Sequence, residues 1–404
     1  MKKLVLDNGV RLLYKYREGS HSSFSIALEA GANSEGQDNI GVAHALEHII
    51  FKGTENYTED QINSKLDELF GFNNAMTNFP YVIYYGTTSN DDFYEGFKLY
   101  SDLVLKPKLN DCGFQEEMNV IKQESDEWKE DLEQYCEDLL LFNGFSKERI
   151  NEIIIGEKHN LDKINLEQLK SFYDKVYVPN NMVVSVITSL DFEYVKDRIN
   201  ELFGDLKGKI NSLIEVCNRE VKSGIFTNKV EGNGGGKIVY GFDIGYLTLR
   251  EITGLKLFNM WYGEGVSSIL YDEVRTKVGL AYEVYSTVKA EKGIKLFKIG
   301  ANTSKDSVSN VLNIIDYCID KAKNIDNYID ENDIKKLNKR FKLKTSLELE
   351  RSIVLANRMA VYEIMYNDGA HVFNELNMEY DFTVEELKEI TNKVFKNAVI
   401  QVLI

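Results

Sequence analysis

The sequence predicts an α/β protein of the α+β type, built from two homologous halves that are each a mostly antiparallel sheet packed with helices. Three observations lead to this prediction. The chain has 404 residues, which is more than one hydrophobic core ordinarily holds. Strand-like apolar runs alternate with amphipathic helical patterns along the chain. The order of these patterns also repeats, which places the two halves at residues 1–215 and 222–404.

The first half begins with strands and a helix that carries unusual polar residues. The expected strands are rich in β-branched and aromatic residues and cover residues 3–6, 10–16 and 23–30. The helix lies in the run GVAHALEHIIFKGT at residues 41–54, with Asn39 as its expected N-cap and Gly53 as its expected stop. A second helix, at about 58–71, opens on a capping box of Thr58 and Gln61.

The rest of the first half alternates in the same way. Residues 74–89 are rich in Tyr, Val, Ile and Thr and are expected to form a strand. Further helices are expected at about 90–105, 111–140 and 166–177, and an apolar strand at 181–188 closes the half.

A repeat relates the two halves. Residues 166–177 resemble residues 384–395 at an offset of 218, and an apolar strand follows each copy. Upstream, the surroundings of Gly71 resemble those of Gly279 at an offset of 208. Ordered matches at nearly one offset indicate a duplicated unit, with its joint near 208–225.

Composition excludes several classes of function. A formal net charge of −16 argues against a nucleic-acid partner, because a phosphate backbone requires a basic surface. The four cysteines form no C-x-x-C pair, which argues against a redox motif or a zinc knuckle. The N-terminal apolar run is broken at residues 7–9, and no stretch is long enough for a membrane span. We therefore expect a cytoplasmic protein without a membrane or nucleic-acid partner.

The motif HALEH places three titratable groups on one helical face. Each helical residue advances about 100°, so His44 and His48 lie side by side one turn apart, with Glu47 beside them. Two imidazoles at this spacing suit a tetrahedral zinc ion, and the glutamate can reach a water without being a ligand. This is the H-x-x-E-H arrangement of one class of zinc peptidase.

Other interpretations of the motif stay open at this point. A histidine on an apolar helix is ordinarily a hydrogen-bonded core residue, and this interpretation holds for His21, His159 and His371. A hydrolytic zinc also needs a third protein ligand. The acidic segment 113–140 offers candidates, among which Glu117 and Glu124 share a helical face, but periodicity does not choose between the acids.

Three stretches, GVAHALEHIIFKGT, NNAMT and EEMNVIKQE, resemble the M16 zinc metallopeptidases, the group of insulinase and the mitochondrial processing peptidase. The resemblance covers essentially the whole chain. It implies that Glu124, which lies 76 residues after His48, is the third zinc ligand and that Glu117 supports the site. It also implies that Asn74 and Ala75 lie on an edge strand that receives extended substrate.

The second half resembles the family in the stretch SSILYDEVRTKVGLAYEVYS, whose Arg275 and Tyr282 would reach the substrate. The resemblance further implies a chamber between the halves, one Zn²⁺ per chain and a homodimer. The implied function is hydrolysis of short or unfolded peptides by a zinc-activated water, with Glu47 as general base. The alternatives are a non-catalytic assembly subunit, a partner dedicated to processing one peptide precursor, and a purely structural zinc site.

Overall fold

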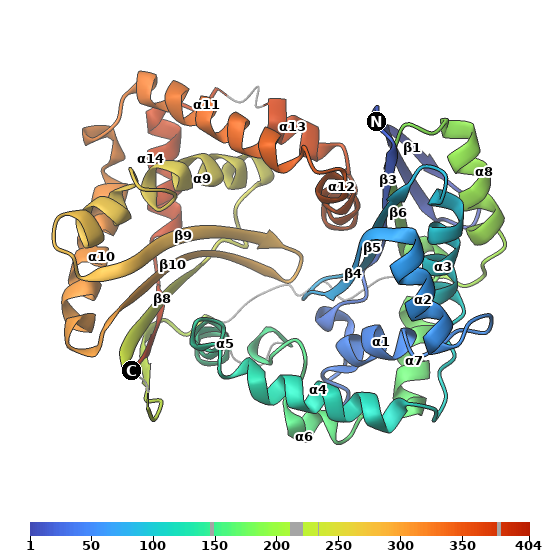
Figure 1. The fold of residues 1–404 in the computed structure, drawn as a ribbon. Helices are drawn as coiled ribbons and strands as arrows, with labels where there is room; N and C mark the ends of the chain where they lie inside the picture. Colours follow the sequence, from blue (N-terminus) through green and yellow to red (C-terminus); the bar gives the residue numbers. More distant parts are fainter. Residues whose placement is uncertain (146–148, 211–220, 233, 378–380) are drawn as a thin grey trace. The chain divides into compact units, whose positions relative to one another are not determined.

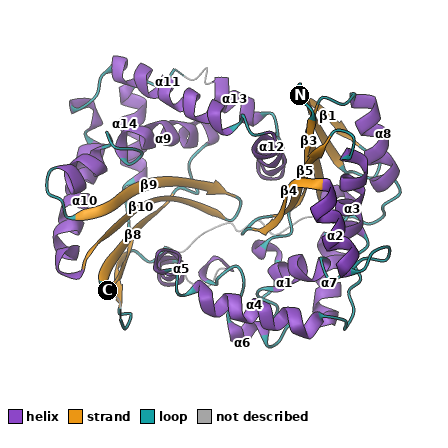
Figure 2. Cartoon of the chain, viewed as in Figure 1, coloured by secondary structure: helices purple, strands orange, loops and turns teal. Residues whose placement is uncertain are grey.

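The computed structural model describes residues 1–145, 149–210, 221–232, 234–377 and 381–404 (Figures 1 and 2). The chain divides into two compact units that are not contiguous in sequence. Unit 1 consists of residues 1–126, 153–215 and 346–374, and unit 2 consists of residues 127–152, 216–345 and 375–404. Each unit contains a mixed sheet covered by helices, which confirms the predicted fold class.

Unit 1 is built on a six-stranded sheet in the order β1-β2-β6-β3-β5-β4. All its pairs are antiparallel except β2 with β6. One face packs against helices around Phe24, Phe97 and Tyr100, which are fully buried. The strands of this sheet are β1 (Lys2–Val5), β2 (Arg11–Tyr16), β3 (His21–Leu28), β4 (Phe70–Thr77), β5 (Val82–Ser89) and β6 (Met182–Thr188). The helices assigned wholly or mostly to unit 1 are α1 (Val42–Ile50), α2 (Glu59–Leu69), α3 (Phe93–Leu105), α4 (Phe114–Trp128), α6 (Lys158–Leu161), α7 (Leu166–Val176), α8 (Phe192–Phe203), α12 (Ser352–Tyr366) and α13 (His371–Asn377).

Unit 2 repeats this topology with one strand fewer. Its sheet has the order β7-β11-β8-β10-β9, and β7 with β11 is its parallel pair. In each sheet, one strand of the parallel pair follows a helix that begins with a capping box. In unit 1, β6 follows α7, and in unit 2, β11 follows α14. The strands are β7 (Gly224–Asn228), β8 (Gly235–Asp243), β9 (Ala281–Glu291), β10 (Ile294–Ser304) and β11 (Val399–Leu403). The helices are α5 (Leu132–Gly144), α9 (Leu249–Tyr262), the π-helix η4 (Tyr271–Thr276), α10 (Val308–Lys323), α11 (Glu331–Glu348) and α14 (Val384–Val394).

Each sheet is also covered by a helix from the other half of the sequence. In unit 1, Ser23 and Ser25 of β3 face away from the apolar core and bond to Ser352 and Asn357 of α12. In unit 2, Gly241 of β8 leaves room for Leu140 of α5, which packs on β8 and β11. These strands are therefore buried on both faces, which explains why the apolar runs of the sequence do not alternate cleanly with polar residues.

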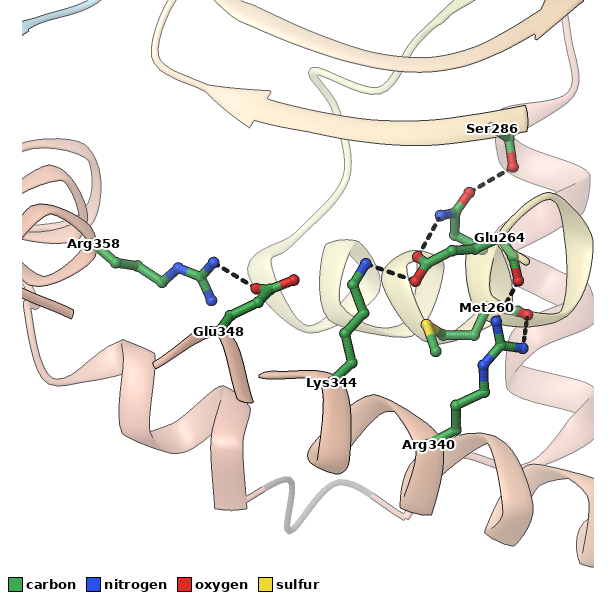
Figure 3. Close-up of polar contacts among 8 residues, drawn as sticks. Met260, Glu264, Ser286, Arg340, Lys344, Glu348 and Arg358 are labelled. Atoms are coloured by element: carbon green, nitrogen blue, oxygen red, sulfur yellow. Dashed lines mark hydrogen bonds and ion pairs between the residues drawn. The ribbon is translucent and has the colours of Figure 1, made fainter. Parts of the chain in front are cut away.

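Polar contacts fix α11, the helix in which the chain passes from unit 2 to unit 1 (Figure 3). In unit 2, Arg340 donates to the carbonyl oxygens of Met260 at 3.1 Å and of Glu264, and Lys344 bonds to the Glu264 carboxylate at 2.6 Å. In unit 1, Arg358 of α12 bonds to Glu348 at 2.8 Å. The C-terminal half of α11 is thus anchored in both units, by Arg340 and Lys344 in unit 2 and by Glu348 in unit 1.

The structure corrects three local predictions. Residues 74–89 form parts of two strands rather than one, because Asn78–Tyr81, which include Pro80, make a turn between β4 and β5. The expected helix at 111–140 is broken into α4 and α5, and Asp131 caps the second helix by accepting from Glu133 and Gln134. The N-cap of α1 is Gly41 and not Asn39, the residue predicted for this helix.

Other predictions have different outcomes. The capping box of Thr58 and Gln61 is confirmed. The predicted boundary between residues 215 and 222 stays a prediction, and residues 211–220 of the joint lie outside the described residues. Among the described residues, no helix is long and apolar enough to cross a membrane.

Candidate metal centre

The start of α1 is fixed by a glycine and a glutamate. Gly41 has φ of +90°, a left-handed conformation that favours glycine, and a Cβ there would meet the carbonyl oxygen of Ile155 at 2.5 Å. No side chain of the helix caps these first turns. The Glu35 carboxylate instead accepts from the backbone N–H groups of Gly41 at 3.0 Å and Ala43 at 2.9 Å. This carboxylate supplies the negative charge that a helix N-terminus favours and sets the position of the motif.

His44, Glu47 and His48 project from one face of α1, as the spacing predicts. The rings of His44 and His48 have centroids 4.6 Å apart. His44 is buried, whereas Glu47 and His48 are half-buried. The opposite face carries apolar residues such as Leu46 and Ile50, which are fully buried in the core of unit 1. Packing of this apolar face therefore holds the polar face in a fixed orientation.

Helix α4 brings Glu124 to the two histidines. Glu124 Oε1 lies 3.8 Å from His44 Nε2, and Glu124 Oε2 lies 3.6 Å from His48 Nε2. These separations are too long for hydrogen bonds. They agree with the roughly 3.4 Å expected between two donors that each lie about 2.1 Å from a tetrahedral zinc ion. One donor atom from each of the three residues lies within 4.8 Å of the others, so the set fits one such ion.

Glu117 supports the cluster from the other side of His48. Its Oε1 lies 2.9 Å from His48 Nδ1, which leaves Nε2 of that ring to face Glu124. Glu117 Oε2 lies 3.3 Å from Lys52 Nζ, which also bonds to Glu59 at 2.6 Å. Lys52, in the turn that follows α1, therefore links two carboxylates. A carboxylate that holds the second nitrogen of a histidine fixes the ring and raises its basicity toward a metal.

Burial sets the protonation of the motif. The pKa of His44 is lowered to about 3, mainly by burial and to a lesser extent by the neighbouring His48. His44 is therefore neutral near pH 7 and has a lone pair to offer a metal. Burial raises the pKa of Glu47, while the hydrogen bond from Thr77 opposes this rise. A carboxyl with a raised pKa is better matched to proton transfer near neutral pH.

Glu47 contacts a residue of the sheet. The hydroxyl of Thr77, the last residue of β4, donates to Glu47 Oε2 at 2.5 Å. Asn74 and Ala75 lie on the same strand, which pairs with β5 and, among the described strands, forms one edge of the sheet. Asn74 is exposed, and its Oδ1 accepts from the N–H of Ala75 at 2.9 Å. The predicted substrate-binding positions therefore lie on an edge strand whose far end touches Glu47.

Arg275 and Tyr282 lie in unit 2. Arg275 is at the end of η4, where its guanidinium lies 4.9 Å from the centre of the Tyr271 ring, and Tyr282 is in the edge strand β9 with 64% of its surface exposed. Both residues line one hollow of 690 Å³. The structure thus brings these two predicted residues together within their own unit.

Two family models match the chain. Residues 11–158 match the model described as insulinase (peptidase family M16), and residues 163–340 match the model described as the peptidase M16 inactive domain. The chain belongs to the M16 peptidase family. The match to the inactive domain spans the end of the first half and much of the second, and no H-x-x-E-H occurs in residues 163–404.

Relatives and solved structures agree with this assignment. An uncharacterized zinc protease of Rickettsia felis is 26% identical over 309 residues, which are 75% of this chain and 73% of that protein. An uncharacterized zinc protease of Streptomyces coelicolor is 24% identical over 98% of this chain and 87% of that protein. The crystal structure of a protease from Helicobacter pylori shares the fold, with a TM-score of 0.88 and 20% identity over 100% of this chain and 99% of that one. The relatives thus support a zinc-dependent protease of the M16 family.

Sequence reasoning missed three residues around the cluster: Glu35 bonds to the start of α1, Lys52 to Glu117 and Thr77 to Glu47. Lys52 carried a usable signal, because it lies four residues after His48 and would share its face in the predicted helix, although α1 ends at Ile50. Glu35 and Thr77 carried none, since their contacts depend on how a loop and a strand fold back onto α1.

Proposed function

We propose that this M16 protein is a zinc metalloendopeptidase that binds one Zn²⁺ per chain and hydrolyses short or unfolded peptides. The observation that carries the proposal is the cluster of His44, His48 and Glu124 beside the half-buried Glu47. Two imidazole nitrogens and one carboxylate are the ligand set of many hydrolytic zinc sites, which keep a further position open. Among the described residues, no histidine, cysteine, aspartate or glutamate joins these three as a fourth ligand. This favours a hydrolytic over a structural site.

The side chains of the cluster have separate roles in this proposal. His44, His48 and Glu124 hold the ion, and Glu117 orients His48. Zinc, when bound there, supplies a Lewis acid that polarises the scissile carbonyl and makes water nucleophilic near neutral pH. Glu47 accepts the proton of the attacking water and then donates it to the nitrogen of the departing amine.

Substrate binding would use the edge strand and unit 2. Because β4 is an edge strand, an extended peptide can add to it through main-chain hydrogen bonds near Asn74 and Ala75. Such binding depends little on side chains and supports broad specificity. Arg275 and Tyr282 offer a guanidinium and a phenol hydroxyl, which can hold peptide carbonyl groups or stabilise a developing oxyanion. We also propose that the chain forms a homodimer in the cytoplasm.

The test compares zinc content and peptide hydrolysis in matched variants. Wild-type protein loaded with zinc should cleave internal bonds in a quenched peptide library, and a chelator should stop cleavage. Glu47→Gln should retain zinc and lose about 100-fold or more in kcat, because it cannot take a proton. Glu124→Gln should lose zinc, whereas Glu127→Gln, on the same helix, should keep both zinc and activity. Zinc binding without any cleavage by wild type would favour the non-catalytic assembly subunit instead.

A further inference from the structure

Thr77 connects the edge strand to Glu47 through the 2.5 Å hydrogen bond from its hydroxyl. Among the described residues, Thr77 is the one whose side chain donates a hydrogen bond to the Glu47 carboxylate. The hydroxyl engages Oε2, and the Thr77 backbone N–H also interacts with this carboxylate and lowers its pKa, so one residue of β4 holds the Glu47 side chain. We propose that Thr77 is a positioning residue that fixes the Glu47 carboxylate in the orientation needed for proton transfer. This inference rests on the proposed peptidase function, in which Glu47 is the general base.

The position of Thr77 suits it to this role. Its backbone is held by pairing with Val82 of β5, so the hydroxyl is carried by a strand within the sheet. Threonine is branched at Cβ and has few χ1 rotamers, so the direction of its hydroxyl is well defined. A carboxylate on a two-carbon stem rotates readily about its terminal bond. A short charge-assisted hydrogen bond to one oxygen restricts this rotation and presents the other oxygen in one direction.

The location on β4 gives the contact a second consequence. A peptide that adds to the edge near Asn74 and Ala75 would lie along the same strand that orients Glu47. The peptide backbone and the base then share one rigid frame. A displacement of about 1 Å between reacting groups is enough to slow an enzyme about 100-fold, so such a frame has kinetic value.

The alternative is that the Thr77 hydroxyl only satisfies a partly buried carboxylate and stabilises the fold. Thr77→Val separates the two roles, because valine keeps the branched shape and removes the donor. Thr77→Ser keeps the donor and removes one methyl group. Thr87→Val is the matched control: Thr87 lies on the adjacent strand β5, and its hydroxyl bonds to Ser23 at 2.8 Å rather than to the motif.

Four quantities are measured for each variant: kcat, KM, the zinc dissociation constant by competition with a chelator, and the affinity of the zinc-loaded protein for a peptide hydroxamate. The hydroxamate binds zinc and places an acidic proton beside the base, so its affinity reports the orientation of Glu47 without turnover. In Thr77→Val we expect kcat and hydroxamate affinity to fall about tenfold to 100-fold, the range of one hydrogen bond to a charged group. KM and the zinc dissociation constant should change less than about twofold, and Thr77→Ser should restore most of kcat.

Three results would overturn the inference: Thr77→Val within twofold of wild type in kcat, Thr77→Ser as slow as Thr77→Val, or loss of zinc in Thr77→Val but not in Thr87→Val. The first removes the role, the second assigns it to side-chain volume, and the third assigns it to the fold. Failure of the proposed function is distinguishable, because wild type and Thr87→Val would then also show no hydrolysis.

Discussion

At the scale of single residues, surroundings assign the roles within the motif. His44 is neutral because it is buried, His48 is oriented by Glu117, and Glu47 is held by Thr77 at the end of a strand. The spacing of the motif was enough to predict that these three residues share a helical face. Their partners come from helix α4 and strand β4, and such contacts depend on tertiary packing that periodicity does not encode.

Lys52 is expected to strengthen zinc binding although it touches no ligand. Its ammonium lies 3.3 Å from Glu117 Oε2, and Glu117 in turn orients His48. Loss of an outer-shell partner ordinarily weakens metal binding about tenfold to 100-fold, and Lys52 lies one contact further out. We therefore predict that Lys52→Met raises the zinc dissociation constant by about threefold to tenfold. Chelator competition measures this change.

The matched control for Lys52→Met is Lys65→Met. Lys65 is on the neighbouring helix α2, where its ammonium lies over the Tyr57 ring at 5.6 Å. Both variants remove one positive charge from the same region, so a general electrostatic effect would strengthen zinc binding in both, whereas loss of the contact with Glu117 would weaken it in Lys52→Met alone. Equal dissociation constants for Lys52→Met and wild type would show that the contact with Glu117 does not act on the metal.

At the scale of elements, the break between α4 and α5 is the main departure from the predicted helices. Residues 113–140 have continuous helical character, and the sequence signal for a break is limited to Asp131, a good N-cap that is also common elsewhere in acidic helices. The break has a structural purpose: α4 carries Glu117 and Glu124 in unit 1, while α5 covers the sheet of unit 2. A local pattern cannot reveal that one run of helix serves two cores.

Asp138 gives this region a measurable pH dependence. It accepts from Trp128 Nε1 at 2.7 Å and from Gln134 at 3.0 Å, and burial raises its pKa to about 6 despite these bonds. The folded state therefore favours the protonated form. The stability that protonation contributes is present below the ordinary pKa of 3.8 and is lost as pH rises through about 6. From pH 5 to pH 7 this loss should be about 1 kcal/mol.

Asp138→Asn should remove this component, because asparagine does not titrate. We predict that the unfolding free energy of the variant, relative to wild type, rises by about 1 kcal/mol between pH 5 and pH 7. Tryptophan fluorescence in urea is a suitable probe, since both tryptophans of the chain, Trp128 and Trp261, belong to unit 2. Asp320→Asn, at an exposed site of the same unit, should show no such trend. A constant difference between Asp138→Asn and wild type would contradict the assignment.

At the scale of the whole molecule, the repeat was visible in the sequence, whereas the exchange of segments between the units was not. Helices α7 and α14 share a capping box, a length and a following strand, so their similarity survives as local pattern. Helix α12 packs on β3 and β6, and its Glu363, which is fully buried, pairs with Lys3 at 2.7 Å. The contacts of α12 with β3 and with Lys3 join residues that are more than 300 positions apart, and no local pattern records them.

Because each unit contains a helix from the other half of the sequence, we predict that neither contiguous half folds by itself. A fragment of residues 1–215 lacks α12, so the polar face of β3 loses its cover and Lys3 and Arg11 lose the Glu363 carboxylate. A fragment of residues 216–404 lacks α5 and uncovers β8 and β11. We expect each fragment alone to unfold without cooperativity, and we expect the two fragments to assemble when they are expressed together, because each supplies the helix that the other needs.

Zinc binding makes this prediction specific to unit 1, since His44, His48 and Glu124 all belong to it. The fragment 1–215 alone should bind zinc weakly, and adding a peptide of residues 346–374 should tighten binding, because this peptide completes the unit. A peptide of residues 308–323, the helix α10 of unit 2, should have no effect. If fragment 1–215 alone unfolded cooperatively and bound zinc as tightly as the full chain, α12 would be dispensable for the site. Because α12 buries Ile353, Leu355 and Met359 within unit 1, we expect the peptide to be required.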